Sequence, residues 1–393
     1  RTITLSPRGN VLVLERGEER VTLLWDQNGD QSADGRRTVA SAPGLNHGLA
    51  VWDGHVYASS DTTVYRWRFE ERGPPAYDDI EVGARETVIK NMNADGFGGA
   101  PMGHRTRTLV FDAQGRLYIS VGSKWNTDPT PYRSRVRRFT LAASIPAGGI
   151  DFSTGEVWAD GLRNEVGLNF DSNGVLWGVE NGADWLHRDD LGGDIHQDNP
   201  AEELNRLDNP GGFYGYPMCW TEYQLSGGFG LGRGTIWTWP DFLPGGEFGG
   251  FNDSWCRSHS IGPALAMHGH SAPLGIEFYR GQTDVWNNST CKDEAGQSVG
   301  LPDAWRGHAI ISFHGSWNRD NPTGYKVVRV PFTSPGDSVP SGEPIDLLRH
   351  DGNTAQWPHD FRPVDPMFDE CGRLFMSDDT SGTIVVIARN FTR

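Results

Sequence analysis

Histidine, arginine, lysine and asparagine side chains stand directly before or after short alternating runs of apolar residues in this sequence. His104 precedes the run from Leu109 to Phe111, and Lys124 follows the run from Leu117 to Val121. Guanidinium groups bind carboxylates through paired hydrogen bonds, and an uncharged imidazole can accept a proton from a hydroxyl group. Gathered at one place, such side chains would hold a planar, anionic, polar ligand beside a general base.

The apolar runs beside these residues predict β-hairpins, each with a first strand (A), a tight glycine turn and a second strand (B). Most hairpins are followed by a third alternating strand. The repeated order predicts an all-β protein, a six-bladed β-propeller. The alternative is a sandwich of six unrelated hairpins. The turn glycines are Gly9, Gly54, Gly115, Gly174, Gly307 and Gly372.

The interval between Gly174 and Gly307 is the longest between turn glycines, and it holds a segment rich in Gly, Trp, Asp and Pro. We expect residues 1–393 to form a single catalytic propeller domain. Residues 185–269 would be a long loop insertion between blades four and five that caps one face, because long structureless segments in compact domains are usually functional. Most tryptophans of the insertion should pack it onto the propeller, although stacking on a ring-shaped ligand is an alternative for Trp220, Trp237 and Trp239.

The start of strand A and the end of strand B lie at the same end of an antiparallel hairpin. The unusual side chains of different blades should therefore meet on one face of the central channel and make it cationic. Taken singly, such an arginine is more often in a surface salt bridge and such a histidine is more often structural, so the prediction depends on their convergence. The residues at these positions include Asn46, His47, His104, Lys124, Arg163, Asn164, His270, His314, Arg319 and Arg362.

Composition excludes several classes of partner. The net charge of −16 disfavours nucleic acid and anionic membranes, and no apolar run approaches the ~20 residues of a membrane-spanning helix. Several N-x-S/T sequons and four cysteines indicate a secreted, disulfide-bonded glycoprotein, and we expect a monomer. The sequon asparagines are Asn252, Asn287, Asn288 and Asn390.

Several motifs, in order along nearly the whole chain, resemble the soluble sugar dehydrogenases that depend on pyrroloquinoline quinone (PQQ), the glucose/sorbosone dehydrogenase family. They include GHRTRTLVFDAQGRLYISVGS, GLRNEVGLNFDSNGVLWGVENGAD, FHGSWNR and RPVDPMFDECGRLFMSDDTSG. With the sequons and cysteines, the chain looks most like the fungal secreted pyranose dehydrogenases. The resemblance implies PQQ and Ca²⁺ as cofactors. It also implies oxidation of a pyranose hydroxyl by hydride transfer, with electrons passed to an external acceptor such as a haem domain.

The resemblance also implies roles for single residues. His104 matches the base that takes the proton of the sugar hydroxyl, and the carbonyl groups of Gly182 and Ala183 match calcium ligands. The implied PQQ contacts are Arg163, Asn164 and Arg362. The family's lysine at strand B of blade five is replaced in this chain, and Arg319 is the candidate for its role. Lys124 and His314 are also assigned to PQQ, because they stand at the ends of B strands. Asn46 matches a polar residue near the substrate in this family, and His270 is assigned to substrate binding because it stands at the start of a strand A.

Four cysteines allow three disulfide connectivities. Cys291 and Cys371 fall in the A–B turns of blades five and six, and Cys219 and Cys256 both fall in the insertion. We therefore expect the pairs Cys291–Cys371 and Cys219–Cys256.

Two other functions stay open. A calcium-dependent propeller lactonase would need carboxylate and asparagine ligands on the axis, where this chain offers arginines. A non-enzymatic receptor-type propeller would have no use for a base at His104.

Overall fold

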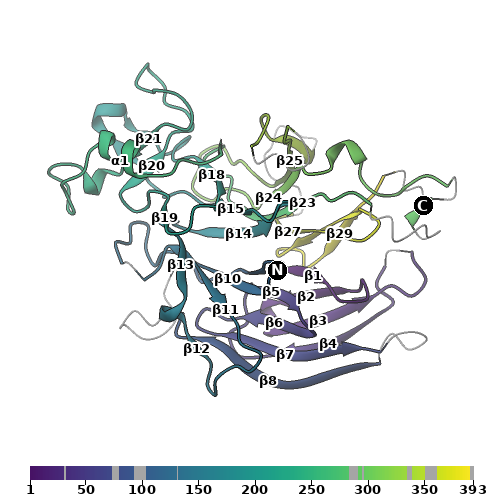
Figure 1. Ribbon diagram of the computed structural model, residues 1–393. Coiled ribbons are helices and arrows are strands. Elements are labelled where there is room, and N and C mark those ends of the chain that lie inside the picture. Colours follow the sequence, from purple (N-terminus) through teal and green to yellow (C-terminus); the bar gives the residue numbers. More distant parts are fainter. Residues whose placement is uncertain are drawn as a thin grey trace.

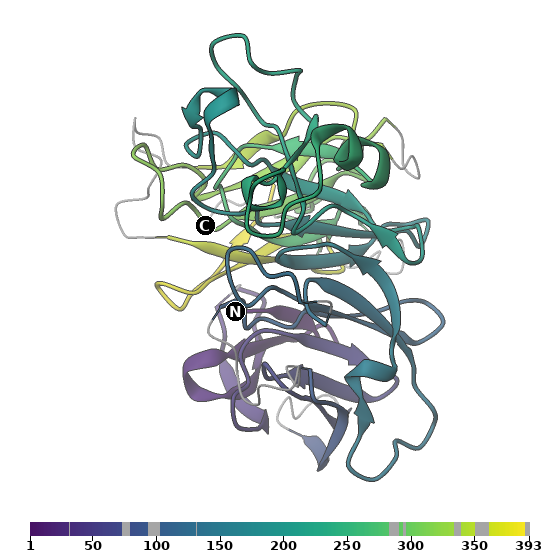
Figure 2. The same ribbon diagram turned by 90° about the vertical axis from the view of Figure 1, so that its left-hand side faces the viewer.

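The structure is a computed structural model that describes residues 1–30, 32–72, 79–92, 103–130, 132–282, 291–293, 296–333, 339–349 and 361–389. These residues form six main sheets that follow one another around a central axis, with the first and last blades side by side (Figures 1 and 2). The predicted six-bladed β-propeller is confirmed. No helix in the described ranges is long and apolar enough to cross a bilayer.

The first three blades carry their strands in sequence order from the axis outward, and two of them gain an outer strand from a later segment. Blade one contains β1 (Ile3–Leu5), β2 (Val11–Glu15), β3 (Arg20–Trp25) and β4 (Gly35–Ser41), with the 3-10 turn η1 (Arg16–Glu18). Blade two contains β5 (Leu49–Trp52), β6 (His55–Ser59), β7 (Val64–Glu71), β8 (Ile80–Lys90) and the outer β12 (Ile150–Asp151). Blade three contains β9 (Leu109–Phe111), β10 (Arg116–Val121), β11 (Arg135–Thr140), β13 (Glu156–Asp160) and the outer β19 (Gly212–Phe213), with η2 (Phe152–Thr154) before β13.

The last three blades complete the circle. Blade four contains β14 (Glu165–Phe170), β15 (Leu176–Glu180), β18 (Glu202–Arg206) and β22 (Leu265–Met267). Blade five contains β23 (Pro273–Phe278), β24 (Ala309–Phe313), β25 (Lys326–Val330) and β26 (Ile345–Leu348), with η6 (Asp303–Trp305) before β24. Blade six contains β27 (Pro363–Phe368), β28 (Leu374–Asp378) and β29 (Ile384–Ile387) within the described ranges.

An aspartate and a glycine shape the A–B turn of several blades. Between β9 and β10, the Asp112 carboxylate accepts hydrogen bonds from the backbone N–H groups of Gln114 and Arg116. Gly115 adopts a φ of 76°, which lies in the left-handed region that favours glycine. The same Asp-x-x-Gly turn recurs at residues 171–174 and 369–372, so the sequence repeat reflects one local geometry.

Serine hydroxyls near the ends of B strands join neighbouring blades. The Ser377 hydroxyl of β28 donates to the carbonyl of Arg1 at 2.5 Å, and the backbone N–H of Ile3 donates to the Asp365 carboxylate at 2.9 Å. These bonds tie blade six to blade one. Equivalent serine bonds to the next blade are made by Ser59 and Ser312.

The insertion differs from its prediction as a loop between blades four and five. Its residues supply β18 and β22, which pair in the sheet of blade four, so the extra segments lie within that blade. A three-residue strand such as β22 shows no periodicity that sequence reading can detect. The other elements are β16 (His187–Arg188), η3 (Asp189–Leu191), β17 (Gly193–Asp194), β20 (Cys219–Thr221), β21 (Ile236–Thr238), η4 (Pro240–Phe242) and α1 (Asp253–His259).

Candidate active site

His104 lies just before β9, at the predicted end of the hairpin. Its backbone N–H donates to the Ser123 carbonyl at 3.2 Å, and its Nδ1 lies 3.0 Å from the same oxygen. A carbonyl only accepts hydrogen bonds, so Nδ1 carries the proton and Nε2 keeps its lone pair. Burial first, and then the charge of Arg163, lower the pKa of His104 to about 3. The imidazole is therefore uncharged and able to accept a proton.

Arg107 holds the backbone beneath His104. Its side chain is fully buried, and it donates to the carbonyls of His104 at 2.9 Å, Thr106 at 2.7 Å and Asp61 at 3.0 Å. The guanidinium thus links the segment of His104 to blade two. Burial lowers the pKa of Arg107 to about 10, so it still carries a charge at neutral pH.

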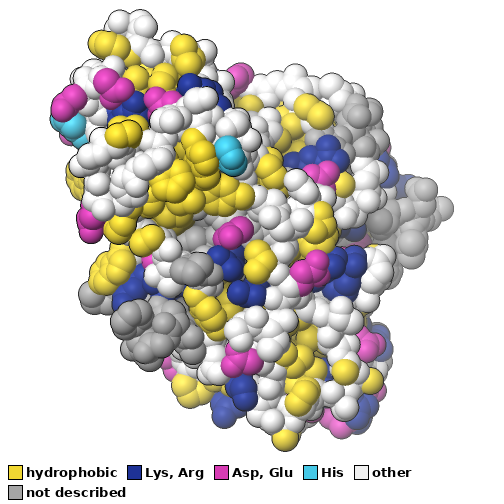
Figure 3. Space-filling model, turned by 60° about the vertical axis from the view of Figure 1, so that its left-hand side comes forward, with side chains coloured by type: hydrophobic (Ala, Val, Ile, Leu, Met, Phe, Trp, Pro, Cys, Tyr) yellow, Lys and Arg dark blue, Asp and Glu magenta, His cyan; other side chains and the backbone are white. Residues whose placement is uncertain are grey.

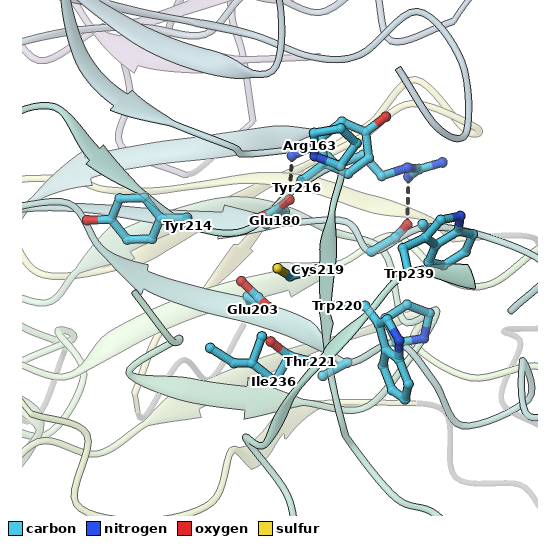
Figure 4. Close-up of a pocket in the computed structure, with 15 residues that line it drawn as sticks. Arg163, Glu180, Glu203, Tyr214, Tyr216, Cys219, Trp220, Thr221, Ile236 and Trp239 are labelled. Carbon is cyan, nitrogen blue, oxygen red and sulfur yellow. Dashed lines mark hydrogen bonds between the residues drawn. The ribbon is translucent and has the colours of Figure 1, made fainter. Parts of the chain in front are cut away.

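Arg163 lies two residues before β14, and its backbone and side chain are both engaged. The backbone N–H donates to Glu180 at 2.5 Å, and Nη1 donates to the Gly182 carbonyl at 2.6 Å (Figure 4). Its own carbonyl accepts from the backbone N–H of Ser123 at 2.7 Å. Because Ser123 also binds His104, the predicted base and the predicted arginine are neighbours across blades three and four.

Asp184 joins three blades. Its carboxylate accepts from Arg163 at 2.9 Å and from Asn318 Nδ2 at 2.6 Å, while its backbone N–H and carbonyl both bond to the Asn126 side chain at 2.7 Å. His270 lies beside it, with Nδ1 3.4 Å from Asn318 Nδ2 and Nε2 3.1 Å from the Asn199 carbonyl. We call Asn126, Arg163, Asp184 and Asn318 the Asp184 cluster.

Glu202 positions the peptide of Gly182. Its carboxylate is 2% exposed and accepts from the backbone N–H groups of Gly182 at 2.7 Å and Ala272 at 3.0 Å. A Cβ on Gly182 would lie 2.9 Å from the Ala201 carbonyl, so the close packing requires glycine. The Gly182 carbonyl consequently faces the Arg163 guanidinium.

Three buried carboxyl groups lie behind Arg163. Glu165, Glu180 and Glu203 surround Asn205, whose Nδ2 lies 3.4 Å from Glu165 and 3.2 Å from Glu180. Burial raises the pKa of all three glutamates. Glu180 and Glu203 also border a cavity of about 30 Å³ between blade four and the insertion (Figure 4), which has room for only one or two waters.

A second group of charged side chains lies where blades five, six and one meet. Asp379 accepts from His314 at 2.8 Å and pairs with Arg1 at 2.9 Å. Although burial opposes it, these partners lower the pKa of Asp379 to about 2. Arg362 donates to the carbonyls of His314 at 3.1 Å and Gly315 at 3.0 Å. We call Arg1, His314, Arg362 and Asp379 the Asp379 cluster.

The two clusters are joined by the loop after β24, since residues 314 and 315 contact Arg362 and Asn318 contacts Asp184. Arg1 and Asp379 also border a cavity of about 850 Å³ in the seam between blades one and six. The structure therefore brings His104, Arg163, His270, His314 and Arg362 to one end of the propeller, as the hairpin argument predicts.

Other predicted site residues have different surroundings. Asn46 donates to the Arg105 carbonyl at 3.1 Å. His47 is buried, and burial followed by the charge of Arg1 lowers its pKa to about 3. Lys124 lies over the Trp125 ring, 5.1 Å from its centroid. Arg319 pairs with Asp198 of the insertion at 3.1 Å rather than with the Asp184 cluster. Asn164 is buried beside Gly122, and Ala183 is buried in the insertion core.

Both predicted disulfides are present: Cys219–Cys256 within the insertion and Cys291–Cys371 between the turns of blades five and six. Trp220, Trp237 and Trp239 are buried in the core of the insertion, so packing is their role.

The sequon residue Asn252 is exposed and caps α1 by accepting from the Trp255 N–H. The sequons at Asn287, Asn288 and Asn390 lie outside the described residues.

Sequence analysis assigned no site role to Asn126 or Arg1, and it did not predict the backbone contacts of Glu202. A signal for Asn126 exists, because Trp-Asn follows strand B in blade three at residues 125–126 and again in blade five at residues 317–318. Arg1 stands two residues before β1, as Arg163 stands two residues before β14. Glu202 has no comparable signal, because its partners are backbone groups far apart in sequence.

Comparison with known proteins gives consistent results. The sequence model of the TrAA12-like family matches residues 1–390. The chain is 33% identical over 419 residues to the pyrroloquinoline quinone-dependent sugar dehydrogenase of Hypocrea jecorina, covering 99% of this chain and 85% of that protein. It is 30% identical over 431 residues to the pyrroloquinoline quinone-dependent pyranose dehydrogenase of Coprinopsis cinerea, covering 99% of this chain.

The chain spans 52% of the length of that Coprinopsis cinerea protein. Among solved structures, the holo form of the PQQ domain of the same pyranose dehydrogenase superposes with a TM-score of 0.78 at 29% identity, covering 99% of this chain and 92% of that domain. The resemblance predicted from the sequence motifs is confirmed.

Proposed function

This chain belongs to the TrAA12-like family, and we propose that it oxidises a pyranose hydroxyl by hydride transfer to bound PQQ, with Ca²⁺ as a second cofactor. The observation that carries the proposal is the uncharged His104 beside Arg163, at the end of the propeller where three blades converge on Asp184. The named relatives are PQQ-dependent sugar and pyranose dehydrogenases.

The residues present fit a quinone that carries carboxylates. Cationic side chains of several blades face one end of a protein whose net charge is −16, and a Cβ on Gly122 would lie 2.7 Å from His104 Cβ and 2.8 Å from Asn164 Oδ1. Within the described structure, Asn46 Oδ1 and Asn318 Oδ1 are buried acceptors with no hydrogen-bond partner. A bound ligand could satisfy these two oxygens with hydroxyl or amide donors.

In this proposal Arg163, Asn164 and Arg362 hold the PQQ carboxylates and carbonyls, with support from Lys124, His314 and Arg319. The carbonyls of Gly182 and Ala183 are the proposed calcium ligands, since Ca²⁺ prefers oxygen. Arg163 donates to the Gly182 carbonyl at 2.6 Å, so Ca²⁺ would use the second lone pair of this oxygen. When bound, the quinone would supply the hydride acceptor and Ca²⁺ the Lewis acid.

His104 acts as the general base in this proposal. Its Nδ1 proton is held by Ser123, so Nε2 is the atom that takes the hydroxyl proton. Burial, and then the Arg163 charge, lower the pKa of His104 and keep the imidazole neutral before substrate binds. An anionic ligand beside Arg163 would offset this charge and raise the basicity of His104. Asn46 and His270 would orient the sugar.

We further propose that residues 1–393 act as one catalytic domain, monomeric and extracellular, that passes electrons to an external acceptor such as a haem domain. The two disulfides support an oxidising compartment. The net charge of −16 favours an acceptor with a basic docking face.

The test is reconstitution of the full chain with PQQ and Ca²⁺, followed by sugar-dependent dye reduction. We expect quinone absorbance in the protein fraction and turnover of at least one free pyranose. His104→Ala should retain PQQ and lose about 10²–10⁴-fold in kcat, whereas His55→Ala, at the start of β6 in blade two, should lose nothing. Failure to bind PQQ, or full activity of His104→Ala, would reject the proposal.

A further inference from the structure

Three exposed tryptophans stand at the ends of the B strands of blades three, four and five. Trp125 is 49% exposed, Trp185 59% and Trp317 68%, and no other tryptophan of the described chain is as exposed. A single exposed apolar side chain is normal, but apolar rings that gather in one patch often mark a binding surface. The face shown in Figure 3 has hydrophobic side chains gathered between the insertion and the blades below it.

Each of these tryptophans adjoins a member of the Asp184 cluster. The adjacent pairs are Trp125–Asn126, Asp184–Trp185 and Trp317–Asn318. The side chains of Asn126 and Asn318 both bond to Asp184. Each ring is therefore one residue away from Asp184 or from an asparagine that bonds to Asp184.

Trp185 and Trp317 form a pair. Their ring centroids are 5.9 Å apart with an interplanar angle of 79°, and the His196 ring centroid lies 5.3 Å from that of Trp185. Two rings at nearly a right angle make an open corner with apolar walls. The adjacent Asn318 is buried and fixes this segment, because its Nδ2 donates to the Asp184 carboxylate at 2.6 Å.

The backbone is strained at Trp185, the residue that carries this exposed ring. Its φ is +63°, a conformation that costs a non-glycine residue about 1–3 kcal/mol. Burial of the ring does not offset that cost, since most of the ring is exposed. Asn126 holds the preceding peptide by bonding to both the N–H and the carbonyl of Asp184. Strain that is maintained by surrounding contacts is typical of functional sites.

We propose that Trp185 and Trp317 form a stacking subsite for a second sugar ring, so that the substrate class is an oligosaccharide or glycoside rather than a free monosaccharide alone. The apolar face of an aromatic ring packs against the C–H face of a pyranose ring. The inference rests on the proposed function, because it assumes that the adjacent site holds the ring that is oxidised. Trp125 contributes less, since Lys124 already lies over its ring.

The first experiment measures binding to the full chain without cofactor, by tryptophan fluorescence and calorimetry. The probes are glucose with maltose and cellobiose, and xylose with xylobiose. We expect a disaccharide to bind at least tenfold more tightly than its monosaccharide. Trp185→Ala and Trp317→Ala should each remove most of that advantage, Trp317→Phe should keep part of it, and the exposed control Ile345→Ala on β26 should keep all of it.

The second experiment measures dye reduction by the chain reconstituted with PQQ and Ca²⁺. The subsite is supported if the enzyme prefers disaccharides and if the two alanine variants lose that preference through a higher KM. Turnover of monosaccharides with no disaccharide preference overturns the subsite but leaves the proposed function standing. Disaccharide-selective binding without any turnover supports the subsite and rejects the proposed function. Variants that slow reduction of the acceptor at saturating sugar, with sugar binding unchanged, would show that the rings dock the acceptor and overturn the inference.

Discussion

Glu202 offers a direct test of how the fold positions the Gly182 peptide. The substitution Glu202→Ala removes the carboxylate that accepts the N–H groups of Gly182 at 2.7 Å and Ala272 at 3.0 Å. These two residues belong to blades four and five, so one side chain sets the distance between the calcium-ligand candidate and the segment that carries His270. The change should therefore affect both stability and cofactor binding.

The expected magnitude follows from the two donors that are left behind. Glu202 is 2% exposed, so water reaches its partners only through rearrangement, and each buried donor without a partner costs about 1–3 kcal/mol. Glu202→Ala should lower the free energy of unfolding by about 2–6 kcal/mol in total. Glu202→Gln can accept only one of the two bonds well and should lose about half as much.

The neighbouring residue supplies the matched control. Glu203 points to the opposite face of β18, toward Glu165 and Glu180. Because burial already raises its pKa, Glu203→Gln removes an unfavourable charge and should leave stability unchanged or raise it. Denaturant unfolding of the cofactor-free chain measures stability, and absorbance titration with PQQ and Ca²⁺ measures affinity, which we expect to fall at least tenfold in Glu202→Ala. Unfolding free energy and affinity equal to those of the wild type would refute this reasoning.

Two further predictions concern protonation and covalent links. Because burial and Arg163 depress the pKa of His104 to about 3, the imidazole stays neutral in the native state while the unfolded state takes up a proton below about pH 6.5. NMR titration of the cofactor-free chain should thus show no protonation of His104 between pH 5 and 8. His104 should also lower the free energy of unfolding progressively as the pH falls from about 6.5. A His104 titration with a pKa near 6.5 would contradict the site geometry. Replacing Cys291 or Cys219 by serine opens loops whose cysteines are 80 and 37 residues apart, which should each cost about 4 kcal/mol in denaturant unfolding. Only the change at Cys219, which borders the cavity beside Arg163, should also weaken PQQ binding. If both serine variants changed the affinity for PQQ equally, the insertion would not be what stabilises the site.

Local pattern was sufficient to predict the propeller and the end at which the candidate site residues gather. Alternating apolar residues, an Asp-x-x-Gly turn and a third strand are encoded within short windows, and their repetition implies a circular array. Hairpin geometry alone then places His104, Arg163 and Arg362 at the same end, because the start of strand A always meets the end of strand B. The motif resemblance added the cofactor and the class of reaction.

Tertiary structure decided which of these groups contact one another. Asp184 binds side chains from blades three, four and five, and Glu202 accepts backbone donors from two blades. No sequence period predicts such contacts, because they depend on loop paths rather than on strand alternation. For the same reason Arg319 turned out to pair with Asp198, and the insertion turned out to complete blade four. Exposure is likewise a property of the folded chain: Trp220, Trp237 and Trp239 pack together in the core of the insertion, whereas Trp185 and Trp317 are exposed to water.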